Sequence, residues 1–466
     1  MASNKEFLLG KLRTGQPMST REQLKITFIL AIPAILAQLS MCLMSYIDAA
    51  MVGRLGSAQA ASIGLVSSCT WILGSFCYAN SSGFSVQIAH RCGAGDLAGA
   101  RKIFFQGLKD TLAASLLLVI AGVAISSPLP VWLGGSEEIN ADAFSYFLLY
   151  SLFLPTFQLA IYCEASLIAS GNLKITSIMS VMMCVLDAGF NYLFIFVLDL
   201  GVKGAAIGTG LATTCVGIFL LIYATRFSRE LKLSKAKTEE MPVSYESKAV
   251  LKNALGISWP LWIQNLAVRG AYIAATIIIA PLGTIAIAAN AFAIIAEGFC
   301  YLPGFGMQDA ATTLVGQSLG AGRKTLAKRF AFITIASGAS MMFALAVLMW
   351  IFAPQIMAML SNDPEVVKLG AKCLRIEAWA ELFFGIGIVA NGCCVGAGDT
   401  LMPSAINLIS MWVVRIGLAL LLIPRYGLEG YWYAMAIELS VKGIIFALRI
   451  SGNKWTNKVL IGAGAN

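Results

Sequence analysis

The sequence predicts an all-α polytopic membrane protein with twelve transmembrane helices in two homologous halves. Three observations carry this prediction. Hydrophobic residues make up 58% of the 466 residues and charged residues only 12%, whereas soluble domains hold about 25% charged residues. Apolar stretches long enough to cross a bilayer recur along the whole chain. The second half of the chain also repeats motifs of the first half at a nearly constant offset.

The expected spans are apolar stretches separated by short polar or Gly-containing turns. They cover residues 24–52, 59–89, 104–127, 142–170, 174–198, 205–226, 251–280, 285–314, 325–353, 366–395, 401–423 and 430–450. The resulting domains are a cytoplasmic N-terminal segment (1–23), a six-helix lobe (24–226), a cytoplasmic linker (227–250), a second six-helix lobe (251–450) and a cytoplasmic tail (451–466).

The distribution of Lys and Arg predicts how these spans are oriented. With the N-terminus in the cytoplasm, 25 of the 33 Lys and Arg residues fall in inner segments and six in outer ones. The remaining two, Arg269 and Arg415, lie within spans. Cytoplasmic loops carry the excess of positive charge in membrane proteins. Both termini are therefore expected in the cytoplasm, and the net charge of +9 indicates membrane topology rather than nucleic-acid binding.

An internal repeat relates the two halves. The offset is 227 residues, or 226 for the last pair, and the matched positions are Pro33 with Pro260, Leu55–Ser57 with Leu282–Thr284, Cys92–Gly95 with Leu319–Gly322, Gly171 with Gly398, and Gly201 and Gly204 with Gly427 and Gly430. Because each half has an even number of spans, the halves enter the membrane from the same side, as parallel repeats.

The polar and charged residues within the spans do not follow the repeat. The mismatched pairs are Asp48 with Ala275, Asp187 with Val414, Asn191 with Leu418, Glu297 with Thr70, Arg269 with Cys42, and Glu381 with Leu154. A symmetric pore would place like residues in both halves. The asymmetry favours a carrier that has a distinct ion site in one half.

The segment from Leu186 to Thr214 holds the strongest candidate site. Asp187 lies within an apolar run, and Asn191 follows one helical turn later on the same face. An ionisable side chain inside a membrane is costly and marks a functional site by default. Asp187 and Asp48, if they lie close together, can share one proton, or their oxygens can bind a hard cation such as Na⁺. The alternatives are a structural role for Asp187, and for Asp48 solvation or pairing with Arg54.

The second half offers another group of charged candidates: Arg269, Glu297, Glu377, Glu381 and Arg415. Glu377 and Glu381 are one turn apart on the expected tenth span and would share a face. Either these residues form an ion-pair network that holds the lobe together, or they bind substrate or protons. The sequence leaves both interpretations open.

Several motifs, taken in order, resemble those of the multidrug and toxic compound extrusion (MATE) family, in its prokaryotic form. The matching segments are IDAAMVGRLG (47–56), NYLFIF with GVKGAA (191–206), LVGQSLGAG (314–322), GAGDT (396–400), and WVVR (412–415) followed by GLEGYW (427–432). The resemblance covers essentially all twelve spans. It implies two six-helix lobes in a V shape and export of organic, often cationic, compounds driven by entry of H⁺ or Na⁺.

The resemblance also implies an ion site in the first lobe. Some relatives use an Asp on the first helix, an Asn and an Asp on the fifth, and a Thr and a carbonyl on the sixth. Asp48, Thr209 and the carbonyl of Ala205 match the first and the last two. On the fifth helix the order is exchanged, because Asp187 comes before Asn191. Relatives also use acids on the seventh and tenth helices, but here the seventh carries Arg269 instead.

We therefore expect an antiporter in a bacterial inner membrane that acts on small organic molecules as a monomer. The alternative is a flippase for lipid-linked oligosaccharides, which would need a more cationic cavity than Arg269 and Arg415 provide. An enzyme is not expected, because no nucleophile–base pair, His/Glu metal site or phosphate-binding loop is present. No cofactor is expected beyond the coupling ion, and no nucleic acid.

Overall fold

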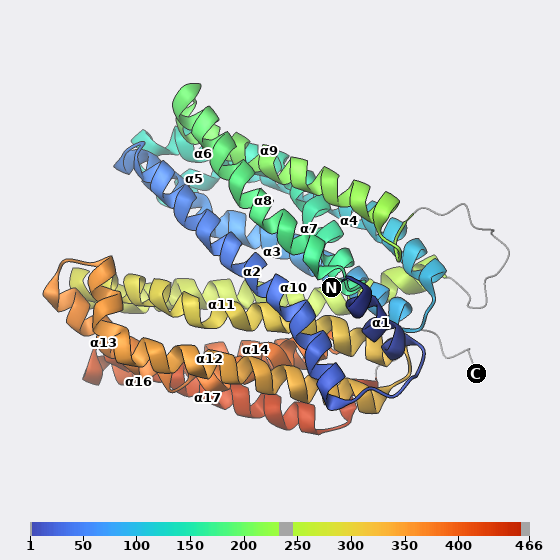
Figure 1. Cartoon of the computed structure of the whole chain (residues 1–466). Helices are drawn as coiled ribbons and strands as arrows, with labels where there is room; N and C mark the ends of the chain where they lie inside the picture. The colour runs from blue at the N-terminus through green and yellow to red at the C-terminus, as the bar shows by residue number, and fades with distance from the viewer. Residues whose placement is uncertain (1, 233–245, 458–466) are drawn as a thin grey trace. The chain divides into compact units, whose positions relative to one another are not determined.

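The computed structural model describes residues 2–232 and 246–457, and this part of the chain is helical, without a strand (Figure 1). The α-helices are α1 (Ala2–Arg13), α2 (Thr20–Gly53), α3 (Ser57–Gly93), α4 (Leu97–Ser126), α5 (Leu129–Trp132), α6 (Glu137–Leu152), α7 (Leu154–Ala169), α8 (Leu173–Asn191), α9 (Gly201–Ile222), α10 (Ser247–Ile279), α11 (Thr284–Gly320), α12 (Lys324–Leu360), α13 (Pro364–Ala378), α14 (Glu381–Gly396), α15 (Leu401–Ile409), α16 (Gly417–Tyr426) and α17 (Leu428–Ser451). The π-helical segments are η1 (Tyr192–Val197), η2 (Tyr223–Phe227) and η4 (Ser410–Ile416), and the short 3₁₀ segments are η3 (Ala280–Leu282) and η5 (Lys454–Asn457). The all-α prediction is confirmed.

Length and composition make this an integral membrane protein. Among the described residues, nine helices are long and apolar enough to cross a membrane, and two bent pairs raise the count to eleven. Helix α17 occupies the place of the twelfth expected span but is not among these eleven, and it carries Glu438 and Lys442 in its middle. Helix α1 forms within the N-terminal segment, and most of the predicted linker, residues 233–245, lies outside the described residues.

The backbone keeps the internal repeat. Six of the ten glycines with positive φ among the described residues form three pairs 227 residues apart, and one such pair is Gly95 (φ 76°) with Gly322 (φ 72°). Both glycines form the turn after a long helix, where a side chain would strain the backbone. The two bent helix pairs also correspond. Helices α6 and α7 meet at 49° and α13 and α14 at 58°, with the two breaks near equivalent positions, Phe153 and Ala380.

The chain forms two compact units. One holds Met1–Ile35 with Ile263–Val459, and the other holds Leu36–Trp262. The divisions fall two residues after Pro33 in α2 and two residues after Pro260 in α10. The first half of α10 therefore packs with the first six-helix half of the repeat, and the first half of α2 packs with the second.

Small residues allow this packing within each unit. A side chain on Gly83 of α3 would overlap the carbonyl of Ala254 in α10, and one on Gly306 of α11 would overlap the backbone of Ile35 in α2. In the contact of α3 with α10, the Ser258 hydroxyl also donates to the carbonyl of Ala79 at 2.8 Å. Close backbone approach by way of small residues is typical of helix packing in membranes.

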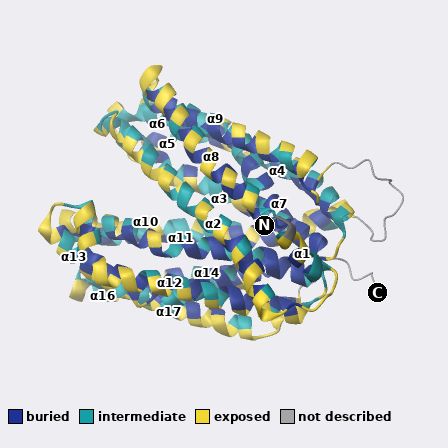
Figure 2. Ribbon diagram, in the orientation of Figure 1, coloured by how far each residue is buried: buried dark blue, intermediate teal, exposed yellow. Residues whose placement is uncertain are grey.

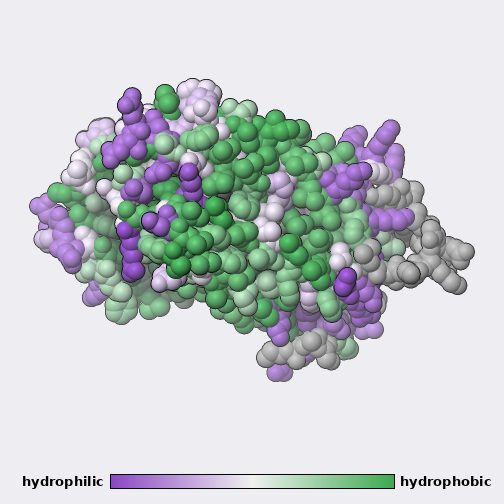
Figure 3. All heavy atoms as spheres, turned by 90° about the horizontal axis from the view of Figure 1, so that it is seen from above, coloured by the Kyte–Doolittle hydropathy of each residue, from purple (hydrophilic) through white to green (hydrophobic). Residues whose placement is uncertain are grey.

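Apolar side chains cover both the interior and much of the surface. The buried residues of each unit lie on the facing sides of its helices (Figure 2). Large hydrophobic side chains also remain exposed along the spans, including Leu117, Val185, Ile277 and Leu421, and the surface in Figure 3 is largely hydrophobic. Lipid tails solvate such a surface, so it needs no protein partner.

Candidate functional site

Three polar side chains from α2 and α8 meet inside the unit formed by Leu36–Trp262. The side-chain nitrogen of Asn191 donates to Oδ1 of Asp48 at 3.0 Å and to Oδ2 of Asp187 at 3.0 Å. Asp187 is fully buried and Asn191 is 2% exposed, whereas Asp48 is half-buried. One amide group thus joins two carboxylates that are 139 residues apart in the chain.

Two oxygen atoms of this cluster lack a hydrogen-bond donor among the described residues. Oδ1 of Asp187 and Oδ1 of Asn191 are buried and accept no hydrogen bond from the residues that the structure describes. A buried acceptor without a donor is costly, so such atoms need an explanation at each site where they occur. With the carboxylate of Asp48, they make an oxygen-only donor set. Oxygen ligands of this kind suit a hard cation, and the carboxylates can alternatively take up a proton.

The backbone changes its winding at the cluster. Helix α8 ends at Asn191, and the π-helical segment η1 begins at Tyr192. Single π-helical turns within α-helices are frequent at functional sites, since they re-aim side chains. The one-turn spacing of Asp187 and Asn191 is kept, while the segment that follows rotates relative to a regular helix.

Helix α9 packs closely against the cluster. A side chain on Gly208 would overlap Oδ1 of Asn191, so this glycine lets α9 approach α8. Thr209 follows Gly208 and is half-buried, and Ala205 lies one turn earlier and is buried. The Thr209 hydroxyl makes no hydrogen bond to Asp48, Asp187 or Asn191 within the described part of the chain. The structure thus brings three of the five expected residues into direct contact and places the other two on the adjacent helix.

Two neighbours of the cluster were not singled out from the sequence. Tyr146 of α6 and Cys184 of α8 both interact electrostatically with Asp48 and Asp187. Cys184 lies one turn before Asp187, a spacing that the sequence does show. Tyr146 comes from α6, and no local pattern in the sequence relates it to Asp187. The alternative pairing of Asp48 with Arg54 does not occur among the described ion pairs.

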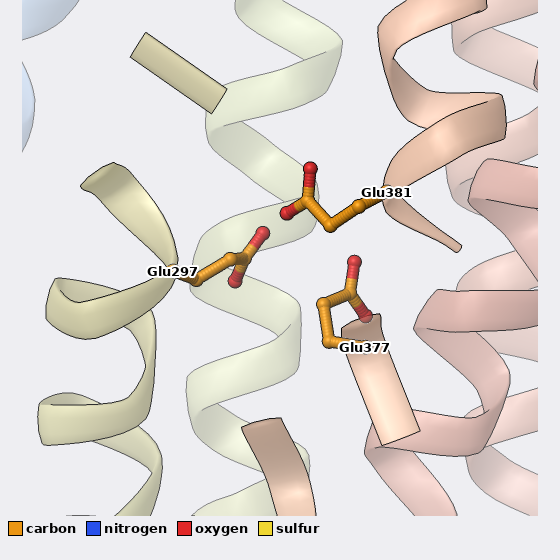
Figure 4. Close-up of side chains that lie close together, drawn as sticks. All are labelled: Glu297, Glu377 and Glu381. Atoms are coloured by element: carbon orange, nitrogen blue, oxygen red, sulfur yellow. The ribbon is translucent and has the colours of Figure 1, made fainter. Parts of the chain in front are cut away.

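A second acidic cluster lies in the other unit. Glu297 of α11, Glu377 of α13 and Glu381 of α14 point toward one another (Figure 4), and one oxygen from each lies within 4.8 Å of the others. Glu377 and Glu381 are fully buried, and Glu297 is 6% exposed. The four carboxyl oxygens of Glu377 and Glu381 have no hydrogen-bond partner among the described residues. Three carboxyl groups so placed need protons or a cation to offset their mutual repulsion.

The helix that carries Glu377 and Glu381 differs from the expected one. A single continuous tenth span was expected, but the chain bends by 58° between α13 and α14. The Ala380 nitrogen bonds to the carbonyl of Glu377 at 2.7 Å, which is the tighter spacing of a 3₁₀ turn. The two glutamates therefore lie on either side of a bend rather than on one helix face.

Arg415 is paired with an acid that was not anticipated from the sequence. Its Nε lies 3.1 Å and its terminal nitrogen 2.6 Å from Oε2 of Glu438, which is fully buried in α17. Lys442 Nζ lies 3.1 Å from the other oxygen of Glu438. Arg415 and Lys442 also interact electrostatically with Glu297. The four-residue spacing of Glu438 and Lys442 within an apolar span was the available signal. Arg269, the remaining candidate, lies half-buried on α10.

A family model matches the chain twice. The model, described as MatE, matches residues 33–193 and again residues 260–421. The two matches begin 227 residues apart, which is the offset of the internal repeat. Together they cover more than half of the chain and all the site residues named above except Ala205, Gly208, Thr209, Glu438 and Lys442.

Curated relatives match along nearly the whole length. A probable multidrug resistance protein NorM from Thermotoga maritima is 24% identical over 442 residues, which is 93% of each chain. A protein of the same name from Pseudomonas aeruginosa is 28% identical over 437 residues, covering 91% of this chain and 88% of the relative.

Solved structures show the same fold. A mutant of the Vibrio cholerae MATE transporter VcmN has a TM-score of 0.85 at 19% identity and covers 96% of this chain and 97% of its own. A multidrug resistance MATE family transporter in an outward-facing conformation has a TM-score of 0.85 at 19% identity, covering 97% of this chain and 98% of its own.

Proposed function

Since this chain belongs to the MATE family, we propose that it is a secondary antiporter that exports small organic compounds in exchange for H⁺ or Na⁺. The NorM relatives are named probable multidrug resistance proteins, and export of the compounds from the cell is the direction that would give resistance. The proposal places the protein in a bacterial inner membrane with both termini in the cytoplasm, and it needs no cofactor other than the coupling ion. The observation that carries it is the cluster of Asp48, Asp187 and Asn191.

In this proposal, the cluster binds the coupling ion. Asp187 is fully buried and its Oδ1 has no donor among the described residues, so an incoming proton or Na⁺ would meet an unsatisfied oxygen there. Asn191 holds the two carboxylates at a fixed distance from its nitrogen and keeps its own oxygen available. The Thr209 hydroxyl and the Ala205 carbonyl on α9 complete the oxygen shell when the ion is bound.

Ion binding would change the packing of α9 against α8. The contact between Gly208 and Asn191 leaves no space between the two helices at this point. A cation drawing Asn191 Oδ1 and Thr209 together, or a proton that removes one negative charge from the carboxylates, alters that contact. Either change gives the ion different affinities for two arrangements of the unit, which is the requirement for coupling an ion to a conformational change.

The second acidic cluster suits a positively charged ligand. Glu297, Glu377 and Glu381 provide buried carboxylates on either side of a helix bend, and the nearby Arg415 is paired with Glu438. We propose that this cluster takes up the cationic group of the organic compound, or protons that exchange with it. A protonated amine on the compound would supply the positive charge that the three carboxylates otherwise need from a metal cation or from protons.

The flippase alternative is less well supported by the charges. A site for a pyrophosphate-linked lipid needs arginine and lysine side chains free to bind phosphate. Arg415 is instead engaged with Glu438 at 2.6 Å, and Lys442 with the same acid at 3.1 Å. The local charge around Glu297 is therefore balanced or acidic rather than cationic.

Flux measurements on purified protein in liposomes test this proposal. Ethidium or a fluoroquinolone would be loaded on the side equivalent to the cytoplasm, and an inward gradient of H⁺ or Na⁺ would be imposed. The expected result is export of the compound against its own gradient under at least one ion gradient. Absence of ethidium and fluoroquinolone export under both gradients would contradict the antiporter, and movement of a fluorescent lipid-linked sugar instead would establish the flippase.

A further inference from the structure

Arg375 is an arginine exposed on the surface of a membrane-spanning segment. It lies near the end of α13, where its guanidinium is 5.5 Å from the ring centre of Trp350 and its Nε donates to the Trp350 carbonyl at 3.3 Å. Among the described residues, no carboxylate lies within ion-pair distance of it. A guanidinium has five N–H donors, so most remain to be satisfied. An exposed guanidinium without a carboxylate partner can bind an anionic group with several hydrogen bonds.

The same face of α13 concentrates positive charge. Lys368, Lys372 and Arg375 are exposed and follow one another at helical spacing, and they are half of the six basic residues predicted to lie on the outer side. Lys372 is bound to Glu429 of α17 at 2.8 Å. The opposite face of α13 is buried and includes Glu377. Membrane topology alone favours few basic residues on the outer side, so this cluster needs another reason.

An open groove begins beside Arg375. It has a volume of about 560 Å³ and is lined by α12, α13 and α17, including Trp350, Arg375, Trp379, Tyr433, Ile437 and Ile444. The ion pair of Lys372 and Glu429 joins α13 and α17 at the surface. Arg375 follows Lys372 by about one turn of α13, and Tyr433 follows Glu429 by about one turn of α17. Arg375 and Tyr433 therefore lie toward the same end of the groove. Beyond them α17 presents an apolar stripe as far as Ile444.

We propose that this groove, the α13–α17 groove, binds an anionic phospholipid whose phosphate is held by Arg375. Guanidinium groups recognise phosphate with two parallel hydrogen bonds, and the Trp350 ring already holds Arg375 in place. The acyl chain lies along Ile437, Val441 and Ile444. Trp379, which is 73% exposed, and Tyr433 are residue types enriched where a membrane meets water. The positive charge on this face disfavours the cationic compounds that the acidic clusters suit.

The groove adjoins the bend between α13 and α14. Ile376 and Ala380 line it, and Glu377 lies between them on the buried side of the chain. A lipid in the groove would therefore pack against the backbone that positions Glu377 and Glu381.

Native mass spectrometry of the full chain in detergent tests the proposal. Phosphatidylglycerol and phosphatidylcholine are titrated separately into the wild type, Arg375→Gln, Ala436→Phe and the control Arg425→Gln. Arg425 is another exposed arginine predicted to lie on the outer side, but it does not line the groove. Ala436→Phe fills the groove while leaving Arg375 in place. Melting temperature and gel filtration confirm that each variant is folded.

The expected result is one retained phosphatidylglycerol, with affinity about tenfold lower in Arg375→Gln and in Ala436→Phe and unchanged in Arg425→Gln. Phosphatidylcholine should bind the wild type about tenfold more weakly than phosphatidylglycerol. Equal phosphatidylglycerol binding by Arg375→Gln and the wild type would overturn the proposal. So would equal retention of the two lipids, or a wild-type dimer that Ala436→Phe dissociates, since the groove would then be an interface between copies.

Discussion

The side-chain nitrogen of Asn191 lies 3.0 Å from Oδ1 of Asp48, a residue of α2 that precedes Asn191 by 143 residues. The same nitrogen lies 3.0 Å from Oδ2 of Asp187, one turn earlier on its own helix. Asn191 therefore sets the separation of two carboxylates that would otherwise repel each other. The exchanged order of the acid and the amide on this helix still gives two carboxylates and one amide in contact.

Removing the bridge should remove the coupling. In Asn191→Ala the carboxylates lose their shared donor, and we expect ion-driven export to fall at least about tenfold, because a charge-assisted hydrogen bond contributes about 1.5–3 kcal/mol. Alanine is a good helix former, so the protein should remain folded. Liposome flux and melting temperature check this. The exchanged variant, Asp187→Asn with Asn191→Asp, keeps the charges and should recover part of the activity. Full activity in Asn191→Ala would show that the bridge is not needed.

The contact of Gly208 with Asn191 predicts a pair of alanine variants with opposite results. Gly208→Ala places a methyl group against Asn191 Oδ1, and overpacking of this kind costs about 1–3 kcal/mol. Gly189→Ala, on α8, has no atom within 4 Å of the added methyl group and should be neutral or stabilising, because alanine favours helices. Thermal unfolding and flux distinguish them. Equal behaviour of the two variants would argue against close packing of α9 on the cluster.

The second acidic cluster should contribute more to transport than to stability. Glu377→Gln and Glu381→Gln replace buried carboxyl groups that have no hydrogen-bond partner among the described residues. We expect export of cationic compounds to fall about tenfold or more, while the melting temperature stays the same or rises, because strained functional groups are often destabilising. Glu365→Gln, exposed on the same helix α13, is the control and should change neither. A lower melting temperature with transport intact would identify the cluster as structural.

The pair of Arg415 and Glu438, in contrast, should contribute strongly to stability. Arg415→Met leaves a fully buried carboxylate with Lys442 as its remaining partner, and breaking a buried pair costs about 3–5 kcal/mol. We expect a large drop in melting temperature. Lys372→Met breaks the exposed pair with Glu429 and should change it little, since exposed pairs are screened by solvent. Similar shifts for both variants would mean that Arg415 is not a structural anchor.

Local patterns predicted the spans and the repeat because both depend on residues close together in the chain. Turn glycines such as Gly95 and Gly322 recur at equal spacing, and the structure gives both a positive φ. The break between α6 and α7 falls inside a fourth span that was expected to be continuous (142–170) and was not predicted, although Pro155 in the first turn of α7 is a local signal for it. The break at Ala380 has neither Gly nor Pro, so it must arise from packing and was not predicted.

The acidic clusters were only partly predictable. The spacing of Asp187 and Asn191 follows from helix geometry, whereas the approach of Asp48 is a tertiary contact that only a family resemblance suggested. Glu438 was overlooked although it lies four residues before Lys442, and its pairing with Arg415 joins two helices whose contact the sequence does not encode locally. The convergence of Glu297 on Glu377 and Glu381 likewise depends on the bend.

The most direct test of the central claim is a flux measurement in liposomes under a pure Na⁺ gradient and under a pure pH gradient. It compares the wild type with Asp187→Asn and with the control Asp199→Asn. Asp199 is exposed and has φ 53°, a conformation that asparagine tolerates, so its variant isolates the loss of an acid. We predict export by the wild type and Asp199→Asn under one of the two gradients, which identifies the coupling ion, and none by folded Asp187→Asn under either. Wild-type export by Asp187→Asn would contradict the assignment of the ion site.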